Sequence, residues 1–417
     1  MHHTDLIALI AVGLTVAFIG GLVATRLKLP LIVGYLGAGV AIGPFTPGFV
    51  GDSDLATQLA EIGIILLMFG VGAHFSVGDL LSVRKVAIPG AVVQIVVATS
   101  LGIGAAALWG WSFGEGLVFG MCLSVASTVV LSRALIERNE LGTDAGRIAI
   151  GWLVVEDLVT VMIIVLLPIF AVSLGGTNRL QGDSELLPQL GLTALKLTAF
   201  VVLVMVFGLR FLRTLLEWVQ RTASRELFIL SILAAALGIA YVAAVWFDAS
   251  FALGAFLAGL VVGESDVSHE ASEEIVPLRE AFSVLFFVSI GMLIDPGFIL
   301  DKPLQVWGVL AIIVVGKTLA AIGLVLLLRR PMRVALIIGA SLAQIGEFSF
   351  ILATLGQQLN LLSDEGRNLI LISAILSISL NPFLFRGIVP LMKIVRRRWP
   401  RLAHYSIAAP ASEATHA

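Results

Sequence analysis

The stretch GWLVVEDLVTVMIIVLLPIF, from Gly151 to Phe170, places two adjacent acids inside an otherwise apolar run. A helix needs roughly 20 apolar residues to cross the hydrocarbon core of a bilayer, so this run predicts a membrane-spanning helix. Glu156 and Asp157 lie about one third of the way along it. A charge at that depth costs from about 2.5 to roughly 10 kcal/mol or more, so such residues normally face a cavity or a partner. The stretch therefore predicts both a membrane fold and the position of a functional site.

The composition of the whole chain excludes a soluble fold. Of its 417 residues, 59% are hydrophobic and 13% are charged, whereas soluble domains carry about 25% charged residues. Cys122 is the only cysteine, which excludes a disulfide within the chain and a metal site built from cysteines. The sequence contains no HExxH motif and no Gly-rich dinucleotide fingerprint after a strand. We therefore expect a lipid bilayer around the protein, no cofactor in this chain and no enzyme activity.

Hydrophobic runs between charged residues, prolines and glycines predict an all-α polytopic membrane protein with 13 transmembrane helices. These spans start near residues 5, 31, 55, 86, 114, 148, 189, 226, 248, 279, 304, 334 and 367. Short cytoplasmic loops normally hold the excess of Lys and Arg. Alternating the loops places only Arg179, Lys302 and Arg367 on one side, two lysines within spans and all other basic residues on the opposite side. This asymmetry predicts an N-terminus outside the cell and a C-terminus in the cytoplasm.

The chain resembles itself at a spacing of about 220 residues. Residues Tyr35 to Gly43 resemble Phe256 to Glu264, and residues Leu66 to Gly72 resemble Leu285 to Gly291. Each match is weak, but the nearly constant offset indicates two six-helix repeats, over residues 5–172 and 226–395. One linker span, over residues 189–215, separates them, so the second repeat enters the membrane from the opposite face. Such inverted repeats are typical of secondary transporters, whose sites lie near the midplane where broken helices meet.

Two corresponding spans carry residues that favour a broken helix. Ser and Thr can serve freed backbone groups and Gly relaxes helical geometry, so a membrane helix can unwind there if it lines a cavity. The alternative is that such residues only let helices pack closely. The matched positions in both repeats favour broken, crossing helices. The residues concerned are Ser124, Ala126, Ser127 and Thr128 in the fifth span, and Gln344, Gly346 and Glu347 in the twelfth.

An inventory of charges within the spans separates the two adjacent acids. Consecutive helical residues point about 100° apart, so Glu156 and Asp157 can have different partners. Lys317, in an apolar run, is the expected counter-ion of one of the two acids, although a buried ion pair that only fixes helix register is an alternative. Arg133 is the expected partner of Glu347. At least one carboxylate is then left without a fixed cation.

A buried carboxylate without a fixed cation must bind a mobile cation or a proton. Burial favours the neutral form of a carboxyl group, while an incoming Na⁺ or K⁺ favours the ionised form. Competition between cation and proton at such a carboxylate is the thermodynamic requirement for cation:proton exchange. For Glu61, in the third span, we favour a structural role. His74, at the end of that span, is expected to be solvated.

Several motifs together resemble the Kef-type monovalent cation:proton antiporter family, most closely its YbaL-like branch. The similarity covers almost the whole chain. It rests on RLKLPLIVGYLGAGVAIGPFTPG from Arg26, EIGIILLMFGVGAHFS from Glu61, ASTVVLSRAL from Ala126, VVEDLV from Val154, SFALGAFLAGLVVGES from Ser250, FFVSIGM from Phe286, VVGK from Val314 and AQIGEFSFIL from Ala343.

The resemblance implies a sodium/proton-antiporter-like fold, with a core domain that moves against a dimerisation domain, and a homodimer. It further implies that Asp157 is the ion-binding carboxylate, that Ser127 and Thr128 lie at the helix crossover, and that Glu156 pairs with Lys317. The sequence departs from glutathione-gated Kef relatives, which carry Gln where this chain has Glu156. This departure puts their gating and coupling ratio in doubt here.

The resemblance also bears on domain organisation. Kef relatives continue into a cytoplasmic nucleotide-binding regulatory domain, whereas this sequence ends in HYSIAAPASEATHA. Residues 1–400 are therefore assigned to the transmembrane domain, and residues 401–417 to a cytoplasmic tail. We expect a chain truncated before the regulatory domain, with a naturally short form as the alternative.

These observations predict a secondary antiporter of the bacterial inner membrane that exchanges K⁺ for H⁺ by alternating access, with Na⁺ as the other candidate cation. The runner-up is a gated monovalent cation channel, in which the acids line a conduction path.

Overall fold

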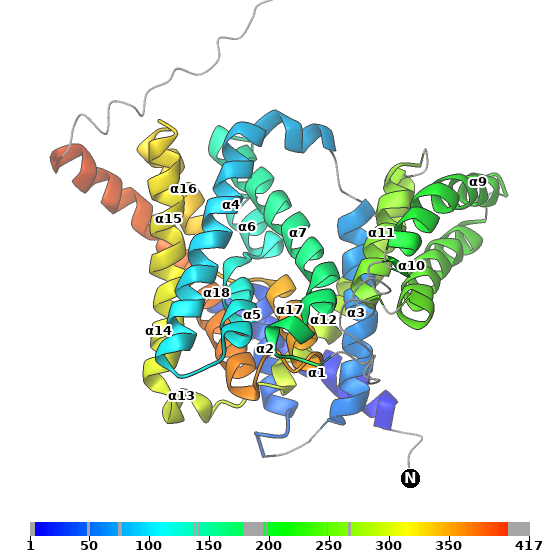
Figure 1. Ribbon diagram of the computed structural model, residues 1–417, viewed down its shortest axis with the longest axis horizontal. Coiled ribbons are helices and arrows are strands. Elements are labelled where there is room, and N and C mark those ends of the chain that lie inside the picture. The colour runs from blue at the N-terminus through cyan, green and yellow to red at the C-terminus, as the bar shows by residue number, and fades with distance from the viewer. Residues whose placement is uncertain are drawn as a thin grey trace, which may run out of the picture. The chain divides into compact units, whose positions relative to one another are not determined.

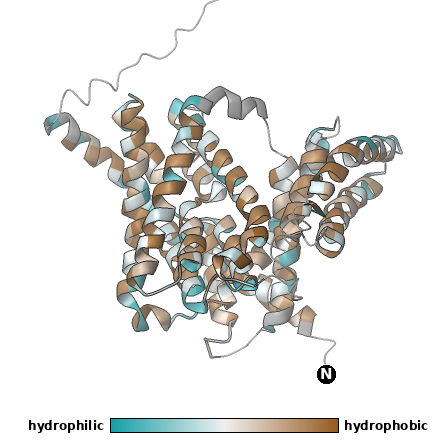
Figure 2. Ribbon diagram, in the orientation of Figure 1, coloured by the Kyte–Doolittle hydropathy of each residue, from teal (hydrophilic) through white to brown (hydrophobic). Residues whose placement is uncertain are grey.

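The structure is a computed structural model that describes residues 5–47, 51–73, 77–136, 138–140, 142–177, 195–196, 198–222, 224–247, 249–265 and 268–398. The regular structure of these residues is helical throughout, without any β-strand (Figure 1). Apolar residues run along most of the helices, as Figure 2 shows. The predicted all-α fold is confirmed for this described part of the chain.

The helices form two compact units, and their boundaries fall within several helices. The first unit comprises Met1–Val77, Val159–Pro303 and Ile351–Ile372, and the second comprises Gly78–Leu158, Leu304–Phe350 and Ser373–Ala417. In chain order the helices are α1 (Asp5–Arg26), α2 (Leu31–Ile42), α3 (Ser53–Ala73), α4 (Val77–Leu108), α5 (Phe113–Ser124), α6 (Thr128–Ile136), α7 (Asp144–Phe170), η1 (Val172–Leu174), η2 (Val204–Gly208), α9 (Leu209–Gln220), α10 (Arg225–Phe247), α11 (Phe251–Gly263), α12 (Ser268–Met292), α13 (Phe298–Asp301), α14 (Pro303–Ala311), η3 (Ile312–Lys317), α15 (Thr318–Leu327), α16 (Met332–Leu342), α17 (Glu347–Gln358) and α18 (Asp364–Arg398).

Within the described residues, nine helices are long and apolar enough to cross a membrane. The bent pair α16 and α17 makes a tenth crossing if it counts as one span. Three shorter apolar helices, α2, α5 and α11, lie where further spans were predicted, but each has only 12 or 13 residues. A straight crossing needs roughly 20 residues. The total of thirteen spans therefore stays a prediction, and the start of the predicted linker span lies outside the described residues.

Glycines allow close helix packing inside the first unit. Helix α3 packs against α11 and α12, and α2 packs against α12. A β-carbon on Gly259 of α11 would collide with the carbonyl oxygen of Phe69 in α3, and one on Gly39 of α2 would collide with that of Val288 in α12. Small residues of this kind let membrane helices approach closely enough for backbone contact.

A fully buried tryptophan joins α4 and α7 in the second unit. Trp152 of α7 is 0% exposed, and a β-carbon on Gly90 of α4 would collide with its indole ring. One helical turn further along each helix lie Gln94 and Glu156, which therefore face each other. In the same unit the π-helical segment η3, which ends at Lys317, packs against α5 and continues into α15.

Candidate ion-binding site

Two helices of the second unit are broken at the predicted positions. Helix α5 ends at Ser124, residues Val125–Ser127 are not helical, and α6 begins at Thr128. Val125 has extended backbone angles, with φ −87° and ψ 132°. Helix α16 ends at Leu342 and α17 begins at Glu347, with a bend of 43° between them. The prediction of a broken helix at both positions is confirmed.

The two breaks are in direct contact. The Gly346 amide donates to the Val125 carbonyl oxygen over 3.3 Å. The Ser127 amide donates to Gln344 Oε1 over 3.0 Å, and Gln344 Nε2 donates back to the Ser127 carbonyl oxygen over 3.1 Å. A β-carbon on Gly346 would lie 2.6 Å from Ser127 Cα, so only glycine permits this approach. These bonds supply partners to backbone groups that unwinding has freed.

Glu156 is held by three donors. Its carboxylate accepts hydrogen bonds from Gln94 Nε2 over 2.5 Å, from Trp152 Nε1 over 3.0 Å and from the Ala126 amide over 3.1 Å. The residue is 0% exposed. Hydrogen bonds to a buried charge offset part of the cost of removing it from water. Glu156 is therefore a fixed acid, tied to α4 and to the break after α5.

Asp157 has a different and incomplete set of partners. Thr128 Oγ1 donates to Asp157 Oδ2 over 2.9 Å. Asp157 Oδ1 is buried and has no hydrogen-bond partner among the described residues, and the whole residue is only 7% exposed. The adjacent acids thus face different neighbours, as the 100° step between consecutive helical residues requires. A buried carboxylate oxygen without a partner is costly unless a cation or a proton joins it.

Lys317 and Glu347 are two further buried charges of the second unit. Lys317 is 0% exposed and donates from Nζ to the Gln344 carbonyl oxygen over 3.0 Å. Its charge also interacts with that of Glu156. Glu347 is 5% exposed and directly follows Gly346, which packs against the backbone of Ser127. The side chain of Arg133, its expected partner, lies outside the described residues.

Analysis of the sequence did not identify Gln94 or Trp152 as partners of Glu156. Gln94 is a buried amide in the middle of the apolar stretch PGAVVQIVV. A polar side chain at that depth is itself a signal of a partner. Trp152 stands four residues before Glu156, which is the spacing of side chains that meet on one helix face.

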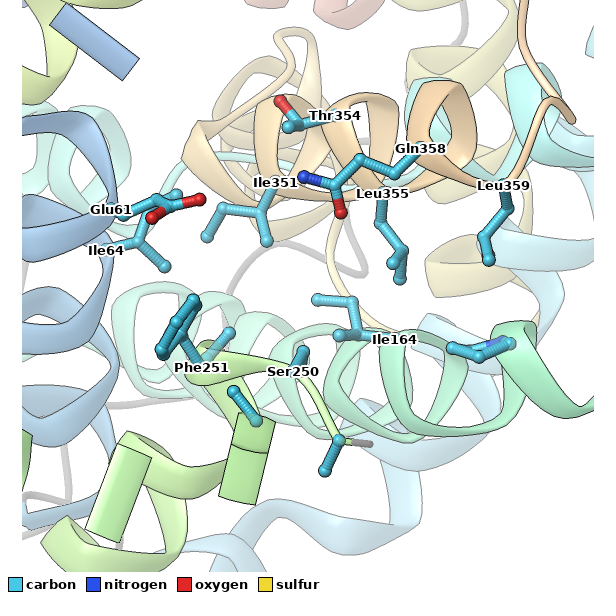
Figure 3. Close-up of a pocket in the computed structure, with 14 residues that line it drawn as sticks. Glu61, Ile64, Ile164, Ser250, Phe251, Ile351, Thr354, Leu355, Gln358 and Leu359 are labelled. Carbon is cyan, nitrogen blue, oxygen red and sulfur yellow. The ribbon is translucent and has the colours of Figure 1, made fainter. Parts of the chain in front are cut away.

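Glu61 lines a cavity inside the first unit. The cavity has a volume of about 260 Å³, and its lining includes Ile164, Phe251, Thr354 and Gln358. Figure 3 shows the side chains of Glu61 and Gln358 directed into this space. The structural role favoured for Glu61 stays a prediction. His74 lies outside the described residues, among which no group of three or more His, Cys, Asp or Glu could hold a metal ion.

Apolar helices, two crossing helix breaks and a buried, incompletely bonded acid define a secondary transporter. The family model "Sodium/hydrogen exchanger, transmembrane" matches residues 14–389. The chain therefore belongs to this family of cation/proton antiporters, which are multi-pass membrane transporters and not enzymes.

Similarity to individual proteins agrees with this assignment. The chain is 56% identical over 389 residues to the Escherichia coli (strain K12) protein "Putative cation/proton antiporter YbaL", covering 92% of this chain and 69% of that protein. It is 33% identical to "K(+) efflux antiporter 5" of Arabidopsis thaliana, covering 94% and 68%. It is 30% identical to "Glutathione-regulated potassium-efflux system protein KefC" of Enterobacter sp. (strain 638), covering 92% and 60%.

The fold is also similar to that of a solved structure. The sodium proton antiporter MjNhaP1 from Methanocaldococcus jannaschii, at pH 8, matches with a TM-score of 0.65 over 94% of this chain and 99% of that chain. The sequences are 17% identical. Similarity at this level shows a common fold.

Proposed function

We propose that this chain exchanges a monovalent cation for protons by alternating access, with cation and proton competing for Asp157. The observation that carries the proposal is the buried Oδ1 of Asp157, which has no hydrogen-bond partner in the described part of the chain. The adjacent Glu156 carboxylate, in contrast, accepts three hydrogen bonds. A mobile ion therefore has one open carboxylate oxygen to bind and a fixed acid beside it.

Ser127 and Thr128 belong to this site because they form the crossing beside Asp157. Thr128 orients the Asp157 carboxylate, and the Ser127 backbone joins the two breaks. Glu156 and Lys317 are proposed as the charge-compensating pair, since their charges interact in the same unit. Removing cation and proton together would leave Asp157 ionised and unpaired, a state too costly to form at membrane depth. The site must therefore be loaded before it changes sides.

The hydrogen bonds at the crossing support the inverted repeat. An offset of about 219 residues relates Val125 to Gln344 and Ser127 to Gly346. The bond between Gly346 and Val125 then corresponds to the bond between Ser127 and Gln344. A pseudo-two-fold axis in the membrane plane would relate the two halves so that each donates an amide hydrogen bond to the other in this way.

We take K⁺ as the favoured cation and Na⁺ as the other candidate, since two of the relatives carry potassium efflux in their names. The remaining proposals are thirteen spans in a bacterial inner membrane, with the N-terminus periplasmic, and a homodimer. A nucleotide-binding regulatory domain is proposed as a cytoplasmic partner. Arg133 remains the proposed counter-ion of Glu347.

The test is exchange by the purified protein in liposomes with a preset pH gradient and a pH-sensitive dye. We expect K⁺ or Na⁺ to dissipate the gradient in a saturable manner with the wild-type protein, and not with Asp157→Asn. The matched control is Asp144→Asn, the same substitution at an exposed position of the same helix, which should behave as wild type.

The outcomes separate the parts of the proposal. Equal dissipation by the wild-type protein and Asp157→Asn would remove Asp157 from the mechanism. A wild-type protein that does not respond to any cation from Li⁺ to Cs⁺ would overturn the exchange itself. A cation flux that neither saturates nor depends on pH would identify the gated channel instead.

A further inference from the structure

A second buried carboxylate lies at the crossing, at the start of α17. Glu347 is the first residue of that helix and is 5% exposed. A carboxylate in the first turn interacts favourably with the helix dipole, but this contribution is much smaller than the cost of burying a charge. Its position therefore calls for a further partner.

The contact between the two breaks brings the start of α17 close to Asp157. The Thr128 hydroxyl donates to Asp157 Oδ2 over 2.9 Å. Gly346, the residue before Glu347, donates its amide to the Val125 carbonyl oxygen and packs against the backbone of Ser127, the residue before Thr128. The two carboxylates are thus near neighbours, although one belongs to α7 and the other to α17.

Each of these two carboxylates has one oxygen atom that accepts no hydrogen bond from the described residues. Asp157 Oδ1 and Glu347 Oε2 are both buried, and neither has a hydrogen-bond partner in the part of the chain that is described. Two neighbouring carboxylates cannot both stay ionised unless something positive lies between them. Hard cations prefer oxygen ligands, and carboxylate oxygens are among the strongest of these in proteins.

We propose that the transported cation is bound between Asp157 and Glu347, with Glu347 as its second carboxylate ligand. This inference rests on the proposed function and assigns a ligand that lies on the other repeat. The occupant is an alkali-metal cation bound by Asp157 Oδ1, Glu347 Oε2 and the Thr128 hydroxyl oxygen. In the alternate state one proton occupies the pair. Exchange of one proton for one monovalent cation leaves the charge of the pair unchanged.

The test compares Glu347→Gln and Glu347→Asp with the wild-type protein in two measurements. The first is the apparent KM and the maximal rate of cation-dependent proton release in liposomes. The second is the equilibrium binding of ⁸⁶Rb⁺ to the purified protein, in competition with K⁺ and Na⁺. We expect Glu347→Gln to weaken cation binding and raise the apparent KM by about tenfold or more, because a charged ligand is lost. Glu347→Asp keeps a carboxylate and should recover part of the affinity.

The matched control is Glu140→Gln, which removes another buried acid of the same unit. Glu140 is 8% exposed, and its carboxylate pairs with Arg333. Its loss should leave the apparent KM unchanged, even if it lowers the amount of folded protein.

Three outcomes would overturn the ligand role of Glu347. One is a Glu347→Gln protein with wild-type KM and ⁸⁶Rb⁺ binding. Another is a Glu347→Gln protein that is inactive but still binds ⁸⁶Rb⁺ with wild-type affinity, since Glu347 would then act on the conformational change. The third is a Glu140→Gln protein with the same loss of affinity. In each case exchange by the wild-type protein and its loss in Asp157→Asn would still support the proposed function.

Discussion

Adding one methyl group at the helix crossing, with Gly346→Ala, should disrupt the site without changing any charge. The new β-carbon would lie 2.6 Å from Ser127 Cα, 2.7 Å from Ser127 N and 2.8 Å from the Ala126 carbonyl carbon. Carbon atoms in contact prefer about 3.5–4.0 Å, so the two breaks must separate by about 1 Å. All three neighbouring atoms belong to the backbone, and no side chain rotation can relieve the clash.

The cost follows from the bonds that this separation would break. Three hydrogen bonds join the breaks, over 3.3, 3.0 and 3.1 Å. A further 1 Å would take each of them beyond hydrogen-bonding distance. Each bond contributes about 1 kcal/mol net, and overpacking adds about 1–3 kcal/mol. We therefore expect Gly346→Ala to lose about 4–6 kcal/mol of stability and to transport about tenfold more slowly or worse.

The assay is the melting temperature of the detergent-purified protein, followed by size-exclusion chromatography, together with proton release in liposomes. The matched control is Gly323→Ala in α15, where a β-carbon would meet nothing within 4 Å. Alanine is favoured over glycine inside a helix by about 0.5–1 kcal/mol, so this variant should be as stable as wild type or more so. If Gly346→Ala melts and transports like Gly323→Ala, the close contact between the two breaks is not essential.

Two further predictions concern basic residues that lie near buried acids. Replacing Lys317 by Met should destabilise the protein by about 3–5 kcal/mol, because it leaves Glu156 buried without its cation. The double variant that also carries Glu156→Gln should lose clearly less stability than the sum of the two single variants. Additive changes in melting temperature would contradict the pairing. Arg333→Ala should lower the melting temperature because it removes the partner of Glu140, whose side chain is only 11% exposed. The control Arg147→Ala removes a surface ion pair whose side chains are 60% and 70% exposed, and it should change the melting temperature little. A larger effect from Arg147→Ala than from Arg333→Ala would show that burial does not decide the contribution of these pairs.

The positions of the helix breaks could be predicted from sequence because unwinding inside a membrane requires particular residues. Freed backbone groups need partners, which limits the residue types at a break. Ser127 and Thr128 in one span, and Gln344 and Gly346 in the other, satisfied that requirement at corresponding positions. The structure places all four at the crossing.

The partners of Glu156 could not be predicted in the same way. Hydropathy identifies a span but not which neighbouring span its polar residues face. Gln94 reaches Glu156 because Gly90 lets α4 approach Trp152, and this is a tertiary contact. An inventory restricted to charged residues also overlooked the neutral donors Gln94 and Trp152, which supply two of the three hydrogen bonds to that acid.

The number of spans is the part of the fold that hydropathy predicts least well. Helices α2, α5 and α11 are strongly apolar but have only 12 or 13 residues. A short apolar run has the same composition whether it crosses the bilayer alone, as half of a broken span, or inside other helices. Composition therefore predicts where such helices lie but not how each one meets the membrane.

The two amide hydrogen bonds at the crossing differ in how many residue types could supply their acceptors. One acceptor is the Val125 carbonyl oxygen, which any residue at that position would provide. The other acceptor is the side chain amide of Gln344, which only a few residue types could replace. Substitutions can therefore accumulate at residue 125 while selection restricts residue 344. If the two halves are repeats, as we propose, such unequal constraint removes their sequence similarity at the crossing before it changes their geometry, and their symmetry should remain visible in coordinates long after it has disappeared from alignments.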